Sequence, residues 1–197
     1  MTAKRRASHR YSTQTKIIYG NSKTGKWDYN HHVIPPISSS SAFRLTTAKR
    51  GAQGFAEFAH HGAGSTVESR APIYVYDRLG EPNKELLEEN LAVAESGEIA
   101  VTYATGMAAI AAVFGCLTGA GDEIITHSIL YGCTHSLLTN WYPRCEITTH
   151  GIDLKDPLSL RRSINARTRV VYFETPVNPT LELIDLGSLR KALGQGP

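Results

Sequence analysis

From about Pro82 onward, short runs of β-branched and apolar residues alternate with segments of helical periodicity. We expect strands at 98–103, 123–126, 146–151 and 169–173, and helices at 85–94, 105–119, 131–140, 156–164 and 186–193. Strands that alternate with helices require right-handed crossovers, which produce a mainly parallel α/β sheet with helices on both faces. Ligands of such sheets bind at the carboxyl ends of the strands, so candidate functional residues are expected there.

The first 80 residues have a different character, because they are rich in Ser, Gly, His and Thr and show little sustained periodicity. The prolines of Val33–Ile37 and the serines of Ser38–Ser41 predict an extended segment. The stretch 51–64 predicts a loop, or a short helix between loops. We therefore expect 1–80 to be an extended arm that contacts a neighbouring subunit, and 81–197 to be a truncated α/β domain.

The composition is that of an ordinary globular protein and narrows the classes of partner. Hydrophobic residues make up 41% of the 197 residues and charged residues 20%, which argues against disorder. The net charge of +3 is too small to indicate nucleic-acid binding, and we interpret its basic N-terminal tip as a solvated tail. The three cysteines are irregularly spaced and indicate neither a disulfide framework nor a zinc site. No apolar stretch reaches the roughly 18 residues that span a membrane. We expect a cytoplasmic protein without a metal, nucleic-acid or membrane partner.

Three groups of residues follow predicted strands and could form a ligand site. Thr105, Gly106 and Met107 lead into a helix, whose free N–H groups and dipole suit a phosphate. Tyr131 could lay its ring on a flat ligand, and Asn178 stands in a loop that two prolines restrain. Each also has a plainer interpretation, as a helix cap, a core tyrosine and a proline-rich turn.

A fourth group, Tyr76 and Arg78, lies upstream in the segment Tyr74–Asn83 (YVYDRLGEPN). Residues two apart in an extended strand project to the same side, which would suit a phosphate clamp. A surface strand that enters a proline-started helix explains the same letters without a ligand.

Taken together, five motifs resemble the trans-sulfuration family, the enzymes of cysteine and methionine metabolism that depend on pyridoxal 5'-phosphate (PLP). They are Val33–Phe43 (VIPPISSSSAF), Tyr76–Asn83 (YDRLGEPN), Ala104–Ile110 (ATGMAAI), Leu130–Thr134 (LYGCT) and Arg169–Asp185 (RVVYFETPVNPTLELID). The resemblance runs from about Thr15 to Leu186. It implies PLP as cofactor and the N-terminal part of the large domain of a fold type I PLP-dependent transferase, behind an extended arm.

The resemblance also implies roles for individual residues. Tyr76 and Arg78 would hold the PLP phosphate of a neighbouring subunit, in a homodimer or tetramer. Thr105 and the amides of Gly106 and Met107 would hold the phosphate within their own subunit. Tyr131 would stack on the pyridine ring and act as the catalytic acid or base. Asn178 would bond the phenolic oxygen of the ring, with Glu174 supporting its loop. A cysteine at position 133, directly after Tyr131 and Gly132, resembles the methionine γ-lyase branch of the family.

The sequence departs from the family in two ways. Asp77 stands where the family has Ser or Thr, and Glu81 where it has Asn, which adds acids beside the phosphate clamp. The lysine that carries PLP as a Schiff base, and the Asp that faces the pyridine nitrogen, fall beyond the matched part. We therefore expect a fragment that is inactive alone and poorly soluble, because its parallel sheet is cut partway.

The function implied for the complete protein is PLP-dependent γ-elimination or γ-replacement on a small amino-acid substrate. That substrate would be a sulfur amino acid or a homoserine ester, as in cystathionine γ-synthase or methionine γ-lyase. β-Elimination on cystathionine stays open. The alternatives are a non-catalytic remnant, or a fragment that only binds PLP or dimerises. A plain nucleotide-binding α/β domain is disfavoured because a glycine fingerprint is missing.

Overall fold

A computed structural model describes residues 12–19, 37–60 and 73–194 of the chain. The chain comprises two compact units, Met1–Thr102 and Tyr103–Pro197. The helix predicted at 85–94 therefore groups with the first unit. The predicted contact of residues 1–80 with a neighbouring subunit stays a prediction, and residues 33–36 of the expected extended segment lie outside the described residues.

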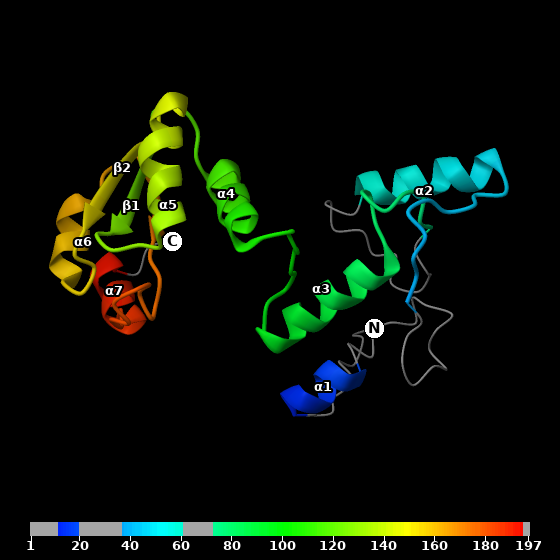
Figure 1. Ribbon diagram of the computed structural model, residues 1–197, viewed down its shortest axis with the longest axis horizontal. Helices are drawn as coiled ribbons and strands as arrows, with labels where there is room; N and C mark the ends of the chain where they lie inside the picture. The colour runs from blue at the N-terminus through cyan, green and yellow to red at the C-terminus, as the bar shows by residue number, and fades with distance from the viewer. Residues whose placement is uncertain (1–11, 20–36, 61–72, 195–197) are drawn as a thin grey trace, which may run out of the picture. The chain divides into compact units, whose positions relative to one another are not determined.

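The described residues of the first unit form three helices, α1 (Thr13–Tyr19), α2 (Ala48–His60) and α3 (Pro82–Ala94) (Figure 1). Helix α2 covers residues 51–60 of the stretch 51–64 predicted as a loop or short helix, and residues 61–64 lie outside the described residues. Two extended segments pair through an isolated antiparallel β-bridge between Ala42 and Tyr76. The bridge is flanked by a bond from the Phe43 N–H to the Val75 oxygen (3.2 Å) and one from the Asp77 N–H to the Ser41 oxygen (3.0 Å).

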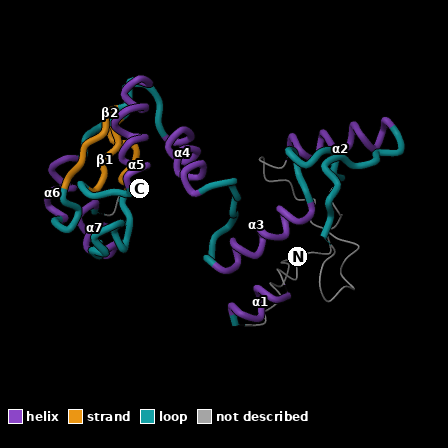
Figure 2. The backbone as a smooth tube through the Cα atoms, viewed as in Figure 1, coloured by secondary structure: helices purple, strands orange, loops and turns teal. Residues whose placement is uncertain are grey.

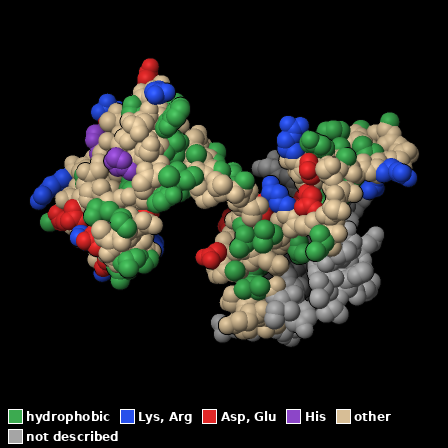
Figure 3. Space-filling model, in the orientation of Figure 1, with side chains coloured by type: hydrophobic (Ala, Val, Ile, Leu, Met, Phe, Trp, Pro, Cys, Tyr) green, Lys and Arg blue, Asp and Glu red, His purple; other side chains and the backbone are tan. Residues whose placement is uncertain are grey.

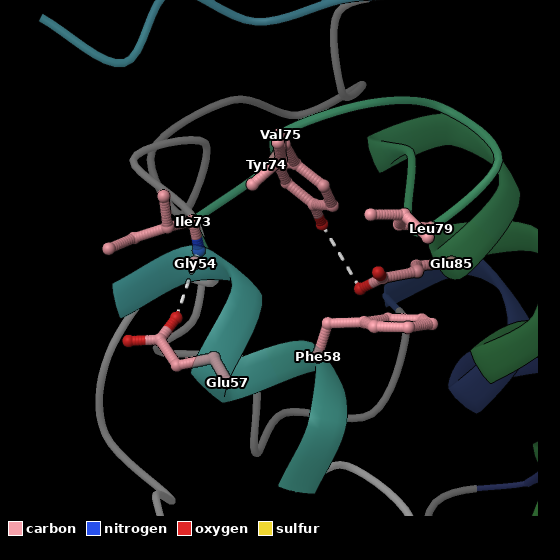
Figure 4. Close-up of a pocket in the computed structure, with 9 residues that line it drawn as sticks. Gly54, Glu57, Phe58, Ile73, Tyr74, Val75, Leu79 and Glu85 are labelled. Atoms are coloured by element: carbon pink, nitrogen blue, oxygen red, sulfur yellow. Dashed lines mark hydrogen bonds between the residues drawn. The ribbon is translucent and has the colours of Figure 1, made fainter. Parts of the chain in front are cut away.

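Helix α2, the segment 73–75 and α3 meet at a small junction lined by apolar side chains and two carboxylates (Figure 4). The Ile73 N–H donates to a Glu57 carboxylate oxygen at 3.2 Å, and the Tyr74 hydroxyl donates to Glu85 at 3.0 Å. The hollow between these residues has a volume of about 30 Å³. That is the space of a single water molecule, so the junction is a packing feature and no substrate site.

Gly54 of α2 lies at this junction and leaves no room for a side chain. A Cβ atom there would come within 2.8 Å of Val75 Cγ2 and 2.9 Å of Ile73 Cγ2. We predict that Gly54→Ala lowers the free energy of unfolding by about 1–3 kcal/mol through overpacking. Urea denaturation measures this. Gly115→Ala is the matched control, because Gly115 is also helical and its Cβ would meet nothing within 4 Å. The control should be neutral or stabilising, and equal losses in both variants would contradict the prediction.

The described part of the second unit is built on three parallel strands, β1 (Glu123–His127), β2 (Thr148–Ile152) and β3 (Thr168–Tyr172), in the order β2-β1-β3. Figure 2 draws strands in orange and labels β1 and β2. Its helices are α4 (Gly106–Leu117), α5 (Gly132–Ser136), α6 (Pro157–Ser163) and α7 (Leu186–Leu193). The helix predicted at 131–140 begins as α5 and continues as a π-helical turn (Leu137–Trp141) and a 3₁₀ turn (Tyr142–Cys145). The predicted parallel α/β fold is confirmed.

Two apolar cores lie on the two faces of the sheet, because neighbouring residues of β1 point in opposite directions. Ile125 packs with Leu160 of α6 and Leu189 of α7 on one face. Ile124 packs with Phe114 of α4 and Leu138 on the other face. The Phe114 ring also contacts the rings of Tyr142 and Tyr172 edge-on. Helices thus cover both faces, as the alternating pattern predicted.

The strand predicted at 98–103 is not formed, and that prediction was wrong. No strand pairs with these residues in the described part of the chain. The side chains of Ile99 and Val101 are 81% and 59% exposed. The N–H and hydroxyl of Thr102 instead donate to Glu88 of α3, at 2.7 and 2.9 Å. An apolar run predicts burial, but a strand also needs a neighbour for its backbone groups.

Acidic side chains and prolines explain where several helices begin. Glu81, Asp156 and Asp185 accept bonds from the first turns of α3, α6 and α7, and proline starts α3 and α6. Such caps satisfy N–H groups that have no acceptor within the helix, and their charge suits the helix dipole. No helix in the described ranges is long and apolar enough to cross a membrane.

A buried carboxylate, Glu123, ties together the amino end of the sheet. It is 2% exposed and accepts a bond from Asn165 Nδ2 at 2.8 Å. It also contacts His150 Nε2 at 3.0 Å and pairs with Arg167. The Asn165 hydrogen bond, with the charges of Arg167 and His150, lowers the pKa of Glu123. The group thus links β1, β2 and the turn before β3.

We predict that stability depends on this ionised carboxylate. A lowered pKa means that the folded state holds the proton less well than the unfolded state. The stabilisation is therefore present above the ordinary pKa of 4.5 and is lost as the pH falls through the folded-state value. Urea midpoints should fall on acidification below pH 4.5, and Glu123→Gln should flatten that dependence. The exposed Glu146→Gln serves as control. Parallel pH curves for wild type and Glu123→Gln would disprove the role.

Candidate cofactor site

The amino end of α4 offers backbone donors beside the carboxyl ends of the strands. Thr105 caps the helix, with its hydroxyl oxygen accepting from the Ala108 N–H at 3.1 Å. The N–H groups of Gly106 and Met107 have no acceptor within the helix. A Cβ at Gly106 would meet no heavy atom within 4 Å, so this end of the helix is open. Such an open helix start can receive an anionic group.

Glu174 joins the loop after β1 to the loop after β3. Its two carboxylate oxygens accept from the Tyr131 N–H at 3.1 and 3.2 Å, and one of them also accepts from the Asn178 N–H at 3.3 Å. One charged group therefore fixes Tyr131 and Asn178 relative to each other. Hydrogen bonds to an ionised acceptor are stronger than those between neutral groups.

Thr134 links this pair of loops to α4. Its side chain is fully buried, and its hydroxyl lies 3.7 Å from Met107 Sδ. Thr105, Gly106 and Met107 are thereby held at the same edge of the sheet as Tyr131, Glu174 and Asn178. The structure brings together all the predicted candidates of the second unit.

Thr134 and Tyr172 were missed as contributors to this site. Burial raises the pKa of Tyr172, and the neighbouring charge of Glu174 raises it further. Tyr172 lies inside a predicted strand, where nothing in the sequence separates it from a core residue. Thr134 could have been identified from the sequence, because it is the last residue of the family motif Leu130–Thr134.

Tyr131 presents an accessible ring beside a thiol. The residue is 43% exposed, and the Cys133 S–H lies 3.4 Å from its phenolic oxygen. The hydrogen bond and charge of Cys133 raise the pKa of Tyr131 above its ordinary value of 10.0. The Tyr131 phenol is therefore harder to ionise than an isolated tyrosine.

The remaining candidates, Tyr76 and Arg78, lie in the first unit. The Arg78 guanidinium stands over the Tyr76 ring, 5.3 Å from its centroid. The two residues occupy a turn, because the Leu79 and Gly80 N–H groups both donate to the Tyr76 oxygen. The predicted extended strand is thus wrong at Arg78, since a turn bends the chain directly after the bridge. The expected juxtaposition of the two side chains is present.

The turn borders an open hollow of about 500 Å³, lined by Ser38–Ser41, Asp77, Arg78, Glu81, Asn83 and Lys84. The Asn83 side chain bonds the backbone of Ser38 through both its oxygen and its nitrogen. This contact holds the serine segment against the start of α3. The serine wall of the hollow is therefore held in place by a hydrogen-bonded side chain, and the lining contains both acidic and basic residues.

In the described residues no group of His, Cys, Asp and Glu is arranged to hold a metal ion.

Comparison with known proteins identifies the class. The family model described as "Cys/Met metabolism PLP-dependent enzyme" matches residues 14–194. The L-methionine γ-lyase of Pseudomonas deceptionensis is 36% identical over 160 residues, which cover 81% of this chain and 37% of that protein. The cystathionine β-lyase of Bacillus subtilis is 31% identical, with coverages of 91% and 40%. The crystal structure of cystathionine γ-lyase from Lactobacillus plantarum complexed with L-serine superposes with a TM-score of 0.71 at 27% identity, with coverages of 92% and 42%.

The chain belongs to the Cys/Met metabolism family of PLP-dependent enzymes. Its fold is that of fold type I PLP-dependent enzymes, as predicted. The chain spans well under half the length of the relatives that it matches.

The site residues fit the cofactor of this family. The open helix start at Gly106 can accept a phosphate, and the exposed Tyr131 ring can stack on a pyridine. Glu174 bonds the Asn178 backbone N–H, and Asn178 is exposed, so its side-chain amide is accessible to a ligand. The donor set thus matches a flat, phosphorylated ligand.

We predict that Cys133→Ser lowers the pKa of Tyr131 toward its ordinary value of 10.0, because serine keeps the hydroxyl contact but does not ionise. A titration of tyrosinate absorbance against pH, compared with Tyr131→Phe to assign the signal, measures the change. Cys116→Ser is the matched control, since Cys116 is also an exposed free cysteine. An unchanged Tyr131 titration in Cys133→Ser would refute the coupling.

Proposed function

We propose that this chain forms the phosphate- and ring-binding part of a PLP enzyme that catalyses γ-elimination or γ-replacement on sulfur amino acids or homoserine esters. The proposed reaction is of the methionine γ-lyase or cystathionine γ-synthase type. The observation that carries the proposal is the grouping of the open α4 start with Tyr131 and Asn178 through Glu174 and Thr134.

PLP, when bound, withdraws electron density from the α-carbon of an attached amino acid and so acidifies its C–H bonds. The chain's own residues bind and orient. The Thr105 hydroxyl and the Gly106 and Met107 N–H groups would hold the phosphate, and the Asn178 amide would fix the rotation of the ring. Preset donors of this kind cost no reorganisation during the reaction.

Tyr131 would supply a proton. Because the pKa of Tyr131 is raised, the phenol keeps its proton at neutral pH. A protonated hydroxyl beside the ring can protonate a departing thiolate or carboxylate. We therefore assign Tyr131 the role of acid toward the leaving group.

Tyr76 and Arg78 would serve the site of a neighbouring subunit. Arg78 lines the open hollow with its guanidinium over the Tyr76 ring, and a planar guanidinium suits a phosphate. The active unit would then be a homodimer or a larger oligomer. The lysine that links PLP covalently would come from sequence beyond the matched part, and a chain without it would bind PLP or dimerise without turnover.

We predict that Thr105→Ala weakens PLP binding about tenfold, because it removes both a helix cap and a phosphate donor. PLP titration followed by tryptophan or PLP fluorescence measures the affinity. Thr118→Ala is the matched control, because Thr118 caps the other end of α4 with a bond to the Phe114 oxygen at 2.8 Å. Similar losses of affinity in both variants would show that the α4 start has no direct role.

The activity itself is tested by completing the chain. We would fuse it to the part of the P. deceptionensis methionine γ-lyase that follows the matched region and assay the product with PLP. Thiol release from methionine would support γ-elimination, and thiol exchange into a homoserine ester would support γ-replacement. Cleavage of cystathionine alone would favour β-elimination. PLP binding without turnover on any of these substrates would favour the non-catalytic alternative.

A further inference from the structure

A buried histidine, His127, ends β1 on the side of the sheet that carries the site. It is 1% exposed, and its Nδ1 accepts from the Leu154 N–H at 3.2 Å. A nitrogen that accepts a hydrogen bond carries no proton, so in the neutral ring the proton resides on Nε2. The ring is thereby oriented, with Nδ1 turned toward Leu154.

The Nε2 atom of His127 faces Glu182. Its distance to Glu182 Oε2 is 3.8 Å, which is too long for a hydrogen bond. Both atoms are buried and have no hydrogen-bond partner within the described residues. Lys155 Nζ pairs with the other Glu182 oxygen at 3.1 Å, and the exposed Asp153 approaches Nδ1 no closer than 4.0 Å. His127 and Glu182 are thus one short movement from a contact.

Glu182 closes the loop that carries Asn178. The Val177 N–H donates to the Glu182 backbone oxygen at 2.8 Å, and the Leu181 N–H donates to the Val177 oxygen at 2.7 Å. The Val177 side chain is fully buried in the core beside Leu154. Asn178 directly follows this anchor, while Glu174 holds its N–H from the other side. A shift at Glu182 is therefore transmitted to Asn178 through two backbone bonds.

We propose that His127 is a positioning residue that sets the place of Asn178 through Glu182. The inference rests on the proposed function, in which Asn178 orients the cofactor ring. Buried donors and acceptors favour pairing, so the His127–Glu182 approach biases the loop toward the sheet. His127 does not touch the reacting atoms, and the mechanism above makes no use of it.

Amide hydrogen exchange on the full chain tests the proposal without requiring cofactor. In His127→Phe and in Glu182→Met, the Val177 and Leu181 amides should exchange about tenfold faster, while the β1 amides keep their protection. His127→Gln should restore slow exchange, because glutamine, like neutral histidine, offers one acceptor and a donor. Asp153→Asn is the matched control and should behave as wild type, since Asp153 lies beside the same ring.

Unchanged exchange at Val177 and Leu181 in His127→Phe would overturn the proposal. So would a uniform acceleration that includes the β1 amides in both His127→Phe and Glu182→Met, because that pattern reports only lost stability. PLP titration of the same variants distinguishes a failure of the proposed function from a failure of the role proposed for His127. If wild type binds PLP, His127→Phe should bind about tenfold more weakly and His127→Gln should recover. If wild type binds no PLP, the proposed function fails, and the exchange pattern still decides the role of His127.

Discussion

The second unit depends on the complete burial of β1. All five of its residues are buried, and the strand is paired on both edges in the order β2-β1-β3. Ile124 belongs to the core on one face and Ile125 to the core on the other face. The helices on both faces therefore pack against the same short strand. The α4 helix is apolar along its length, and hydrophobic side chains over α4 are visible at the surface in Figure 3. An apolar helix of this kind requires cover on more than its sheet side.

Two carboxylates join separate segments of the chain at the two ends of the sheet. At the amino end of the sheet Glu123 joins β1 and β2 to the turn before β3, and at the carboxyl end Glu174 joins the loops after β1 and β3. Both positions lie where separate segments converge and backbone or side-chain donors would otherwise be unpaired. The charged acceptor satisfies several donors at once, which makes the loop geometry resistant to change.

The sequence predicts the features that depend on local pattern. The three strands of the sheet and the cap at Thr105 follow from apolar runs and from a polar residue at a helix start. The failed strand at 98–103 depends on a pairing partner, which periodicity does not reveal. Glu174 was identified only through the resemblance to a family. His127 and Tyr172 went unnoticed because their contacts come from segments distant in the chain, and no local spacing records such contacts.

The two acids that depart from the family pattern act differently once their surroundings are known. Glu81 directs one oxygen to the Lys84 N–H at 2.7 Å, so its charge is turned toward the positive end of α3. Its repulsion of an anion beside Arg78 is thereby reduced. Asp77 has no such cap, although its N–H is fixed to Ser41. The hollow thus combines the cations Arg78 and Lys84 with the acids Asp77 and Glu81. A phosphate clamp with that balance binds through geometry more than through net charge, since the guanidinium already lies over the Tyr76 ring.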